Sequence, residues 1–134
     1  MSGSEHPVVA AIRQADRAIS EQDFDTLMGF YADDAVLVVE PGRVARGKMA
    51  IREAFVAIVR HFSHELRVTQ GDIEVLEGAD IALVIMQTLL HVPGEEQLIE
   101  RRATYVFRRN GNDWLCAIDN SYGTALLDGG SAAD

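Results

Sequence analysis

A carboxylate that could do chemistry lies where a short apolar strand ends. Residues 36–39 are valine and leucine, a composition typical of a buried strand, and Glu40 follows them directly. Pro41 and Gly42 then end the strand. If Glu40 faces inward, its charged form is poorly solvated, its pKa rises, and it could act as a general acid or base. The alternative is an exposed glutamate at a strand end, which is the usual location of this residue type.

A second polar candidate lies in the last predicted strand. Strand alternation places Trp114, Cys116, Ile118 and Asn120 on one face, which we assign to the inside because it carries the tryptophan. An amide among apolar neighbours needs a hydrogen-bond partner, and in a cavity that partner could be a ligand. Cys116 is flanked by apolar residues, so we expect a buried side chain rather than a nucleophile.

Two arginine pairs alternate across one predicted strand, Arg101–Arg102 and Arg108–Arg109. In each pair one residue could meet the mouth of a cavity, or all four could be solvated charges. The histidines are scattered: His61 and His64 are three residues apart near a helix end, and no third ligand stands at a useful spacing. The sequence therefore predicts no metal site.

The elements that must position these residues follow from the spacing of apolar side chains. Apolar residues recur at helical spacing in residues 7–21, 24–31 and 47–62, and Asp23 can cap the second of these helices. After residue 64 the pattern alternates, as in strands. Strands are predicted over residues 65–76, 81–92, 97–109 and 114–122, with a bulge or bend at Gly71 and a hairpin turn at Asn110–Gly111. Helices on one face of an antiparallel sheet make an α+β fold.

Composition limits the classes of protein that this chain can belong to. The 134 residues suit a single domain, expected over residues 7–127 between disordered ends at 1–6 and 128–134. A net charge of −9 argues against binding to nucleic acid or to anionic membranes. The longest apolar run, residues 81–90, is too short to span a bilayer, and no signal peptide is visible, so a cytoplasmic protein is the default expectation.

The strand over residues 81–90 is apolar on both faces. Because helices cover only one face of the predicted sheet, the other face should be polar in a monomer. We therefore expect the outer face of the sheet to mediate a homodimer. The monomeric alternative is a sheet that is merely rich in threonine and valine.

Three segments together carry a resemblance to a known superfamily. Tyr31-Ala-Asp-Asp-Ala-Val, Glu40-Pro41-Gly42 and Gly47-Lys-Met-Ala-Ile-Arg-Glu-Ala-Phe resemble the ketosteroid isomerase-like superfamily, which includes nuclear transport factor 2 and the SnoaL-like cyclases. The resemblance covers about residues 7–127, and the last strand is most similar to the SnoaL-like branch. It implies a cone-shaped, cystatin-like α+β fold with three N-terminal helices packed on a curved, mainly antiparallel sheet around a cavity.

The resemblance also implies roles for individual residues. In ketosteroid isomerase the general base comes directly before a proline, and the matching residue here is Glu40, directly before Pro41. The strand that leads to Glu40 is one residue longer in this chain. Tyr105 falls near the position of the oxyanion-hole carboxylate, and Asn120 stands where many SnoaL-like sequences have histidine. We therefore predict Glu40, Tyr105 and Asn120 as catalytic residues. The predicted cavity wall consists of Met28, Tyr31, Phe55, Phe62, Phe107, Trp114 and Ile118.

Two functions from different classes are compatible with these observations. The first is a cofactor-free isomerase, cyclase or dehydratase in which Glu40 takes a proton beside a carbonyl group of a small apolar compound. Tyr105 or Asn120 would then hold the resulting enolate oxygen. The second is a non-catalytic ligand-binding or dimerisation module of the same fold. The first helix carries no tyrosine, whereas the family's oxyanion tyrosine lies there, and this favours the second function. The Glu40–Pro41 corner favours the first, and we expect a protein that binds a small molecule in a cavity, with isomerase or lyase chemistry as its activity.

Overall fold

The structure, a computed structural model, describes residues 6–61, 67–91, 94, 99–124 and 126–127. The expectations for residues 1–5, Phe62 and residues 128–134 lie outside this part of the chain. The described elements are α1 (Pro7–Glu21), α2 (Phe24–Met28), β1 (Tyr31–Glu40), β2 (Arg43–Arg46), α3 (Lys48–His61), β3 (Arg67–Glu77), β4 (Ile81–His91), β5 (Ile99–Asn110) and β6 (Asp113–Asn120). Three helices and one mainly antiparallel sheet confirm the α+β prediction.

The helices begin where the sequence supplies caps. Pro7 occupies the first turn of α1, where its missing N–H leaves no hydrogen bond unmade. His6 lies outside the predicted domain, but its ring accepts a hydrogen bond from the backbone of Val8 and caps the helix. Asp23 caps α2 as predicted, because its side chain accepts hydrogen bonds from the backbone N–H and the hydroxyl of Thr26.

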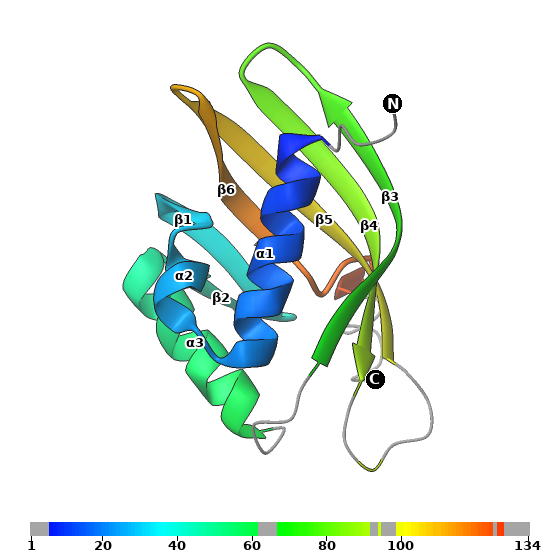
Figure 1. Ribbon diagram of the computed structural model, residues 1–134. Helices are drawn as coiled ribbons and strands as arrows, with labels where there is room; N and C mark the ends of the chain where they lie inside the picture. The colour runs from blue at the N-terminus through cyan, green and yellow to red at the C-terminus, as the bar shows by residue number, and fades with distance from the viewer. Residues whose placement is uncertain (1–5, 62–66, 92–93, 95–98, 125, 128–134) are drawn as a thin grey trace.

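The six strands form one sheet in the order β2-β1-β6-β5-β4-β3. Neighbouring strands are antiparallel except for β1 and β6, which run parallel. The sheet is strongly curved, and α1 crosses its concave face while α3 runs beside β1 and β2 (Figure 1). The concave face is therefore covered by helices, and none of α1, α2 and α3 lies on the other face of the sheet.

The segment after α2 differs from the prediction. Tyr31 does not end a helix but begins the ten-residue strand β1, and β2 is a strand that the pattern did not predict. The two form a hairpin in which Glu40 is paired with Arg43 across a turn of Pro41 and Gly42. Gly42 has φ +80°, as the third residue of a type II turn requires.

Two irregularities in strand pairing decide which side chains face inward. The pairing of β3 with β4 shifts between Gln70 and Ile73, which confirms the bulge predicted at Gly71. In β6 a second bulge lies opposite two consecutive residues of β5: Val106 pairs with Ile118, whereas Phe107 pairs with Cys116. Ala117 is therefore an extra residue, and the alternation of side chains reverses after it.

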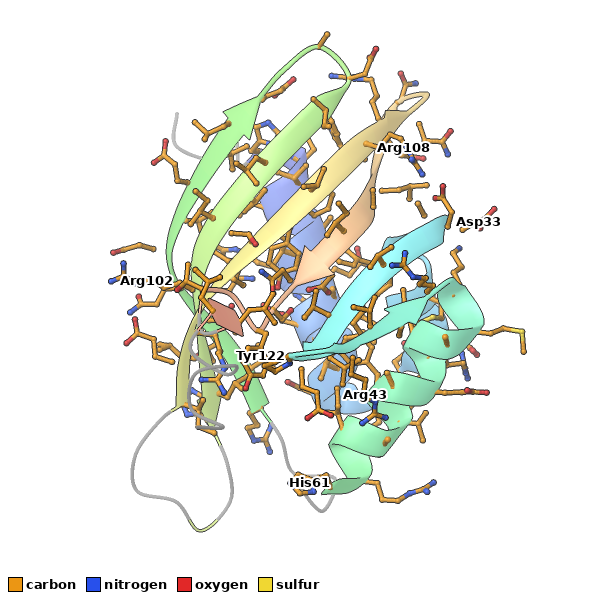
Figure 2. All side chains as sticks on the ribbon, turned by 180° about the vertical axis from the view of Figure 1, so that it is seen from behind. Asp33, Arg43, His61, Arg102, Arg108 and Tyr122 are labelled. Atoms are coloured by element: carbon orange, nitrogen blue, oxygen red, sulfur yellow. The ribbon has the colours of Figure 1, made fainter. Side chains whose placement is uncertain are left out.

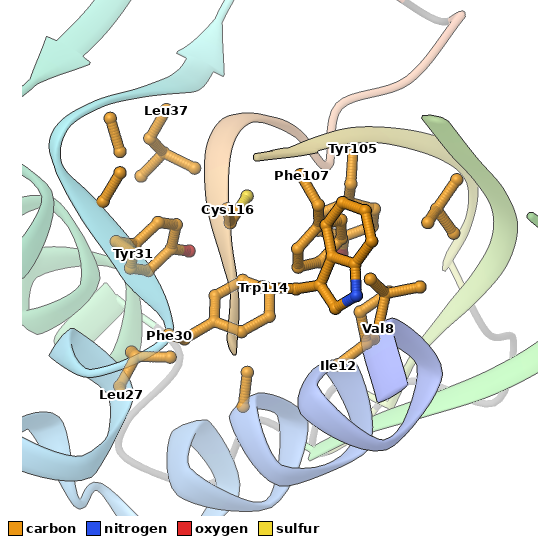
Figure 3. Close-up of a cluster of buried hydrophobic side chains, with 14 of the residues drawn as sticks. Val8, Ile12, Leu27, Phe30, Tyr31, Leu37, Tyr105, Phe107, Trp114 and Cys116 are labelled. Atoms are coloured by element: carbon orange, nitrogen blue, oxygen red, sulfur yellow. The ribbon is translucent and has the colours of Figure 1, made fainter. Parts of the chain in front are cut away.

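The core fills the space between α1 and the concave face of the sheet. Figure 3 shows Tyr31 of β1, Cys116 of β6 and Tyr105 of β5 in one cluster with residues of α1. The rings of Phe30 and Tyr31 meet edge to face with their centroids 4.9 Å apart. Cys116 is completely buried, which confirms the expected structural role of this cysteine.

Candidate functional site

A cavity of about 230 Å³ lies between α1, α3 and the concave face of the sheet. Most of its wall is aliphatic or aromatic, with side chains from α1 and α3 opposite those of β1 and β3–β6. This volume is below the roughly 300–1,000 Å³ of sites for drug-sized ligands, so the cavity suits a small molecule. The polar side chains that reach this apolar space are Asp16, Tyr31, Thr88, Arg101, Tyr105, Asp119, Ser121 and Tyr122.

Asp119 is almost completely enclosed, with only 2% of its surface exposed. The Tyr31 hydroxyl donates to its Oδ2 atom at 2.6 Å, and the Ser121 hydroxyl donates to its Oδ1 atom. Burial raises the pKa of Asp119, and the hydrogen bonds from Ser121 and Tyr31 oppose that rise. Burial and the nearby Asp119 carboxylate together hold the pKa of Tyr31 well above its usual range. Tyr31 therefore keeps its proton and acts as a donor.

Tyr105 extends this network by one step. Its hydroxyl lies 3.4 Å from the oxygen of Ser121. Because Ser121 already donates its only hydroxyl proton to Asp119, Tyr105 is the donor in this contact. The contact is long for a hydrogen bond between hydroxyl groups, so Tyr105 can turn to a ligand oxygen at little cost.

Asp16 brings a second carboxylate to the same cavity from the opposite wall, on α1. It is buried, and its Oδ2 atom accepts a hydrogen bond of 2.7 Å from the side-chain amide of Gln70. Burial raises the pKa of Asp16 to about 7, the hydrogen bond from Gln70 lowers it, and the charge of Asp119 raises it further. At neutral pH this carboxyl group is therefore divided between its protonated and charged forms, as a general acid–base catalyst requires.

Three of the predicted site residues lie in the wall of the cavity. Tyr31 and Tyr105 present their hydroxyl groups to it, and Phe55 of α3 contributes its ring. The two tyrosines belong to the hydrogen-bond network around Asp119, which the sequence analysis did not predict.

The prediction that Glu40 faces the cavity is wrong. Its side chain is 54% exposed at the β1–β2 turn and forms a long ion pair of 3.4 Å with Arg43. The neighbouring Val38 and Val39 line the cavity, but pairing in the hairpin is irregular between Val38 and Glu40, and the strand ends there. Water and Arg43 therefore solvate this carboxylate, and it is not in position to act on a ligand inside.

The assignment of Asn120 and Ile118 to the cavity is also wrong. The extra residue Ala117 reverses the alternation, so Ile118 points outward with 43% of its surface exposed, and Asp119 points inward. The side chain of Asn120 instead closes a turn: its Oδ1 atom accepts a hydrogen bond of 2.9 Å from the backbone N–H of Gly123. This turn places Ser121 and Tyr122 at the cavity.

The remaining predicted wall residues that the structure describes lie elsewhere. Met28 is half-buried on α2 and packs against the core. Phe107 is fully buried but lies among core aromatic rings rather than at the cavity. Trp114 lies near the β5–β6 turn, where the guanidinium of Arg109 stacks 4.6 Å from the centre of its ring. These three residues stabilise the fold.

The sequence carried a signal for Asp16 but none for Asp119. Ile12, Ala15, Asp16 and Ile19 all line the cavity from one face of α1, so Asp16 is an acid inside an apolar helical stripe. Such an acid needs a partner or a raised pKa, and that signal could have been used. Asp119 is inward only because of the bulge at Ala117, which has no glycine or proline to mark it.

Among the described residues, no group of three or more histidine, cysteine, aspartate or glutamate side chains could hold a metal ion. None of the described helices is long and apolar enough to cross a membrane.

Solved structures with this fold come from several bacteria. A protein of unknown function with a cystatin-like fold from Nostoc punctiforme has a TM-score of 0.78 at 13% identity, with 90% of each chain covered. An NTF2-like protein of unknown function from Pseudomonas putida has a TM-score of 0.76 at 20% identity, covering 90% of this chain and 86% of the other. A candidate dehydratase of the NTF2-like family from Streptomyces avermitilis has a TM-score of 0.68 at 19% identity, covering 85% and 92%.

These identities show the cystatin-like fold and leave the chemistry open. No curated protein matches the sequence significantly. The sequence does match the SnoaL-like domain family, over residues 8–117, which is most of the chain. The chain therefore belongs to the SnoaL-like domain family.

Proposed function

We propose that the protein binds a small apolar carbonyl compound in its cavity and moves a proton on it, as a cofactor-free isomerase, cyclase or dehydratase. The observation that carries this proposal is the presence of two buried carboxyl groups, Asp16 and Asp119, in the wall of one apolar cavity. Burial raises the pKa of both groups, which is the usual arrangement for acid–base catalysis near neutral pH.

Asp16 is the better candidate for the group that exchanges a proton with the ligand. Only its Oδ2 atom is engaged by Gln70, and with a pKa of about 7 it can both take and return a proton at neutral pH. Asp119 has both oxygens engaged, by Tyr31 and Ser121. Its role in the proposal is to hold those hydroxyl groups in place.

The oxygen of the ligand needs a donor when a proton leaves the neighbouring carbon, because negative charge then moves onto that oxygen. Burial keeps the pKa of Tyr105 well above its usual range, so its hydroxyl stays protonated and available as a donor. Its long contact with Ser121 can be exchanged for a shorter hydrogen bond to the developing enolate. Tyr105 thus keeps the role that the sequence suggested, while Asp16 takes the role expected of Glu40.

The proposal is tested by deuterium exchange at the carbon beside the carbonyl group of 2-tetralone, followed by NMR in D₂O. The protein should speed this exchange above the buffer rate, and Asp16→Asn should reduce the protein-dependent rate by about 100-fold or more, since a general base contributes about 10²–10⁴-fold. Asp16→Asn keeps an oxygen that can accept the hydrogen bond from Gln70.

Glu40→Gln is the matched control, because it removes a carboxylate that lies outside the cavity. It should leave the exchange rate unchanged. If wild-type protein binds 2-tetralone but the exchange rate stays at that of the buffer, catalysis is contradicted. The protein would then be a ligand-binding protein without catalytic activity.

We also propose that the chain forms a homodimer through the outer face of the sheet, as expected from the sequence. Figure 2 looks onto this face, which carries the labelled Arg102 and Arg108. Between them, cross-strand pairing brings an apolar row into register, formed by Leu76, Leu83, Val106 and Ile118. Leu76 and Ile118 are exposed, and Leu83 and Val106 are half-buried. An apolar row of this kind suits a second copy of the same surface related by a two-fold axis.

A further inference from the structure

Thr88 is a buried polar side chain without a partner. It lies on the concave side of β4, lines the cavity and has 4% of its surface exposed. Its hydroxyl oxygen makes no hydrogen bond, and it is alone in this among the buried side-chain nitrogen and oxygen atoms of the described residues. Burying a hydroxyl without a hydrogen-bond partner lowers the free energy of unfolding by about 1–3 kcal/mol. The Thr88 hydroxyl therefore indicates a position where a bound ligand supplies the missing hydrogen bond.

Arg101 is the direct cross-strand neighbour of Thr88 and also lines the cavity. Its guanidinium stacks over the ring of Tyr122, 4.9 Å from the centroid, and one N–H makes a long hydrogen bond of 3.4 Å to the backbone carbonyl of Glu100. Within the described residues, none of these contacts is with a carboxylate. Most of the donors of this fork are therefore available to a ligand.

The two donors stand apart from Asp119 along the sheet, whereas Asp16 lies nearer to them, because its partner Gln70 is the cross-strand neighbour of Thr88. Arg101 is four residues from Tyr105 along β5, which corresponds to about 13 Å of strand, and Tyr105 is paired with Asp119. The intervening inward side chain on β5 is Ala103, which is fully buried and apolar. The cavity thus has an acidic end at Asp119 and a donor end at Thr88 and Arg101, joined by an apolar middle.

We propose that Thr88 and Arg101 bind the carboxylate of the ligand, so that the cavity takes a small, elongated apolar keto acid. The flat fork of an arginine matches the two oxygens of a carboxylate, and the adjacent threonine hydroxyl can donate a further hydrogen bond. The reacting carbon then lies along the apolar middle of the cavity, between Asp16 on α1 and Tyr105 on β5. This inference rests on the proposed function, because it assigns the ligand class of the same cavity.

Calorimetric titration with 2-naphthylacetate and its primary amide tests the inference, because the two probes differ in charge but hardly in shape. At pH 6, where most of Asp16 is protonated and does not repel an anion, the acetate should bind at least tenfold more tightly than the amide. Arg101→Met should abolish this preference and leave the affinity for the amide within about twofold, because the methionine keeps the apolar stem. Thr88→Val should weaken the binding of 2-naphthylacetate severalfold, because valine has nearly the shape of threonine but no hydroxyl group.

The chain offers matched controls on the opposite face of the same strand. Arg102 and Thr104 alternate with the inward residues of β5, and Arg102 is exposed. Arg102→Met and Thr104→Val should leave the preference for the acetate intact. Arg101→Lys keeps the charge without the fork and should retain part of the preference.

Three outcomes would overturn the inference. Equal affinity for acetate and amide in the wild type, or a preference that survives Arg101→Met, would exclude this subsite while deuterium exchange on 2-tetralone still supported the proposed function. Failure of both probes to bind would also exclude it. If the exchange with 2-tetralone were absent as well, the proposed function itself would fail.

Discussion

The buried carboxyl group of Asp16 destabilises the fold, and the same burial gives it a pKa suited to acid–base chemistry. It lies on the apolar face of α1, where a charged group is poorly solvated, and the hydrogen bond from Gln70 offsets only part of that cost. Asp119 lies in the same environment with two hydroxyl donors. The fold therefore keeps two carboxyl groups in places that apolar residues would stabilise better, which is typical of functional sites.

The pKa of Asp16 predicts how stability changes with pH. It rises from 3.8 in the unfolded chain to about 7 in the folded protein, so the folded state binds the proton more tightly. Asp16 therefore makes its full contribution to the free energy of unfolding below about pH 4. This contribution, on the order of 4 kcal/mol, is lost as the pH rises towards 7. Asp16→Asn should remove this loss.

The measurement is urea unfolding of both proteins between pH 4 and pH 8. Asp16→Asn and wild type should have similar midpoints at pH 4, and the variant should be the more stable at pH 8. A difference that is the same at every pH would contradict the raised pKa.

At the scale of elements, the features of the fold that could be predicted depend on local sequence signals, and the others depend on how strands pair. Pro7 and Asp23 mark helix starts, and Gly71 marks a bulge, since each acts through its own backbone. The inward position of Asp119 depends on how β6 pairs with β5 around Ala117, and this is a property of two strands together. The sequence therefore predicted the helices and most strands, but assigned the wrong face to the end of β6.

The same kind of reasoning explains the error at Glu40. The strand and the turn that follow from its neighbours are both present, and the prediction failed only in the direction of one side chain. Tyr105 lies in the cavity wall because β5 pairs with β4 without interruption from Ile81 to Leu90, so the alternation of its side chains holds.

The turn after β6 should be sensitive to a single methyl group at Gly123. This glycine has φ +72°, and a β-carbon there would lie 2.1 Å from the carbonyl oxygen of Arg102 on β5. Gly123→Ala should lower the free energy of unfolding by about 3 kcal/mol or more, from backbone strain and the clash together.

Gly42→Ala is the control for strain alone. Gly42 has φ +80°, but no atom lies within 4 Å of the position that its β-carbon would take. It should cost only about 1–2 kcal/mol. Equal losses for the two variants, measured by chemical denaturation, would show that the turn can move away from β5.

At the scale of the whole molecule, the sheet divides two tasks between its faces. The concave face holds the cavity, and the outer face carries the apolar row that includes Ile118. A strand that is apolar on both sides, such as β4, serves both faces at once. The sequence indicates that β4 is apolar on both faces, because its apolar run is continuous. It does not identify a partner for the outer face.

The proposed dimer predicts the mass of the particle in solution. Sedimentation at micromolar concentration should give about twice the chain mass of 14.7 kDa. Ile118→Lys should convert the particle to a monomer, because it places a charge at an exposed position of the apolar row. Met49→Lys, at an exposed position on α3, is the control and should leave the dimer intact. A monomeric wild type would contradict the proposed interface.

The extra residue at Ala117 has a consequence for the history of this fold. Loss of that one codon would exchange the inward Asp119 and Ser121 for the amide and aliphatic neighbours that now face outward, and would leave every other strand in place. A family could therefore pass between an acidic and a neutral cavity through a single insertion or deletion, without substituting any residue. In this chain, whether the aspartate of β6 reaches the cavity therefore depends on the bulge at Ala117 as much as on the residue type at position 119.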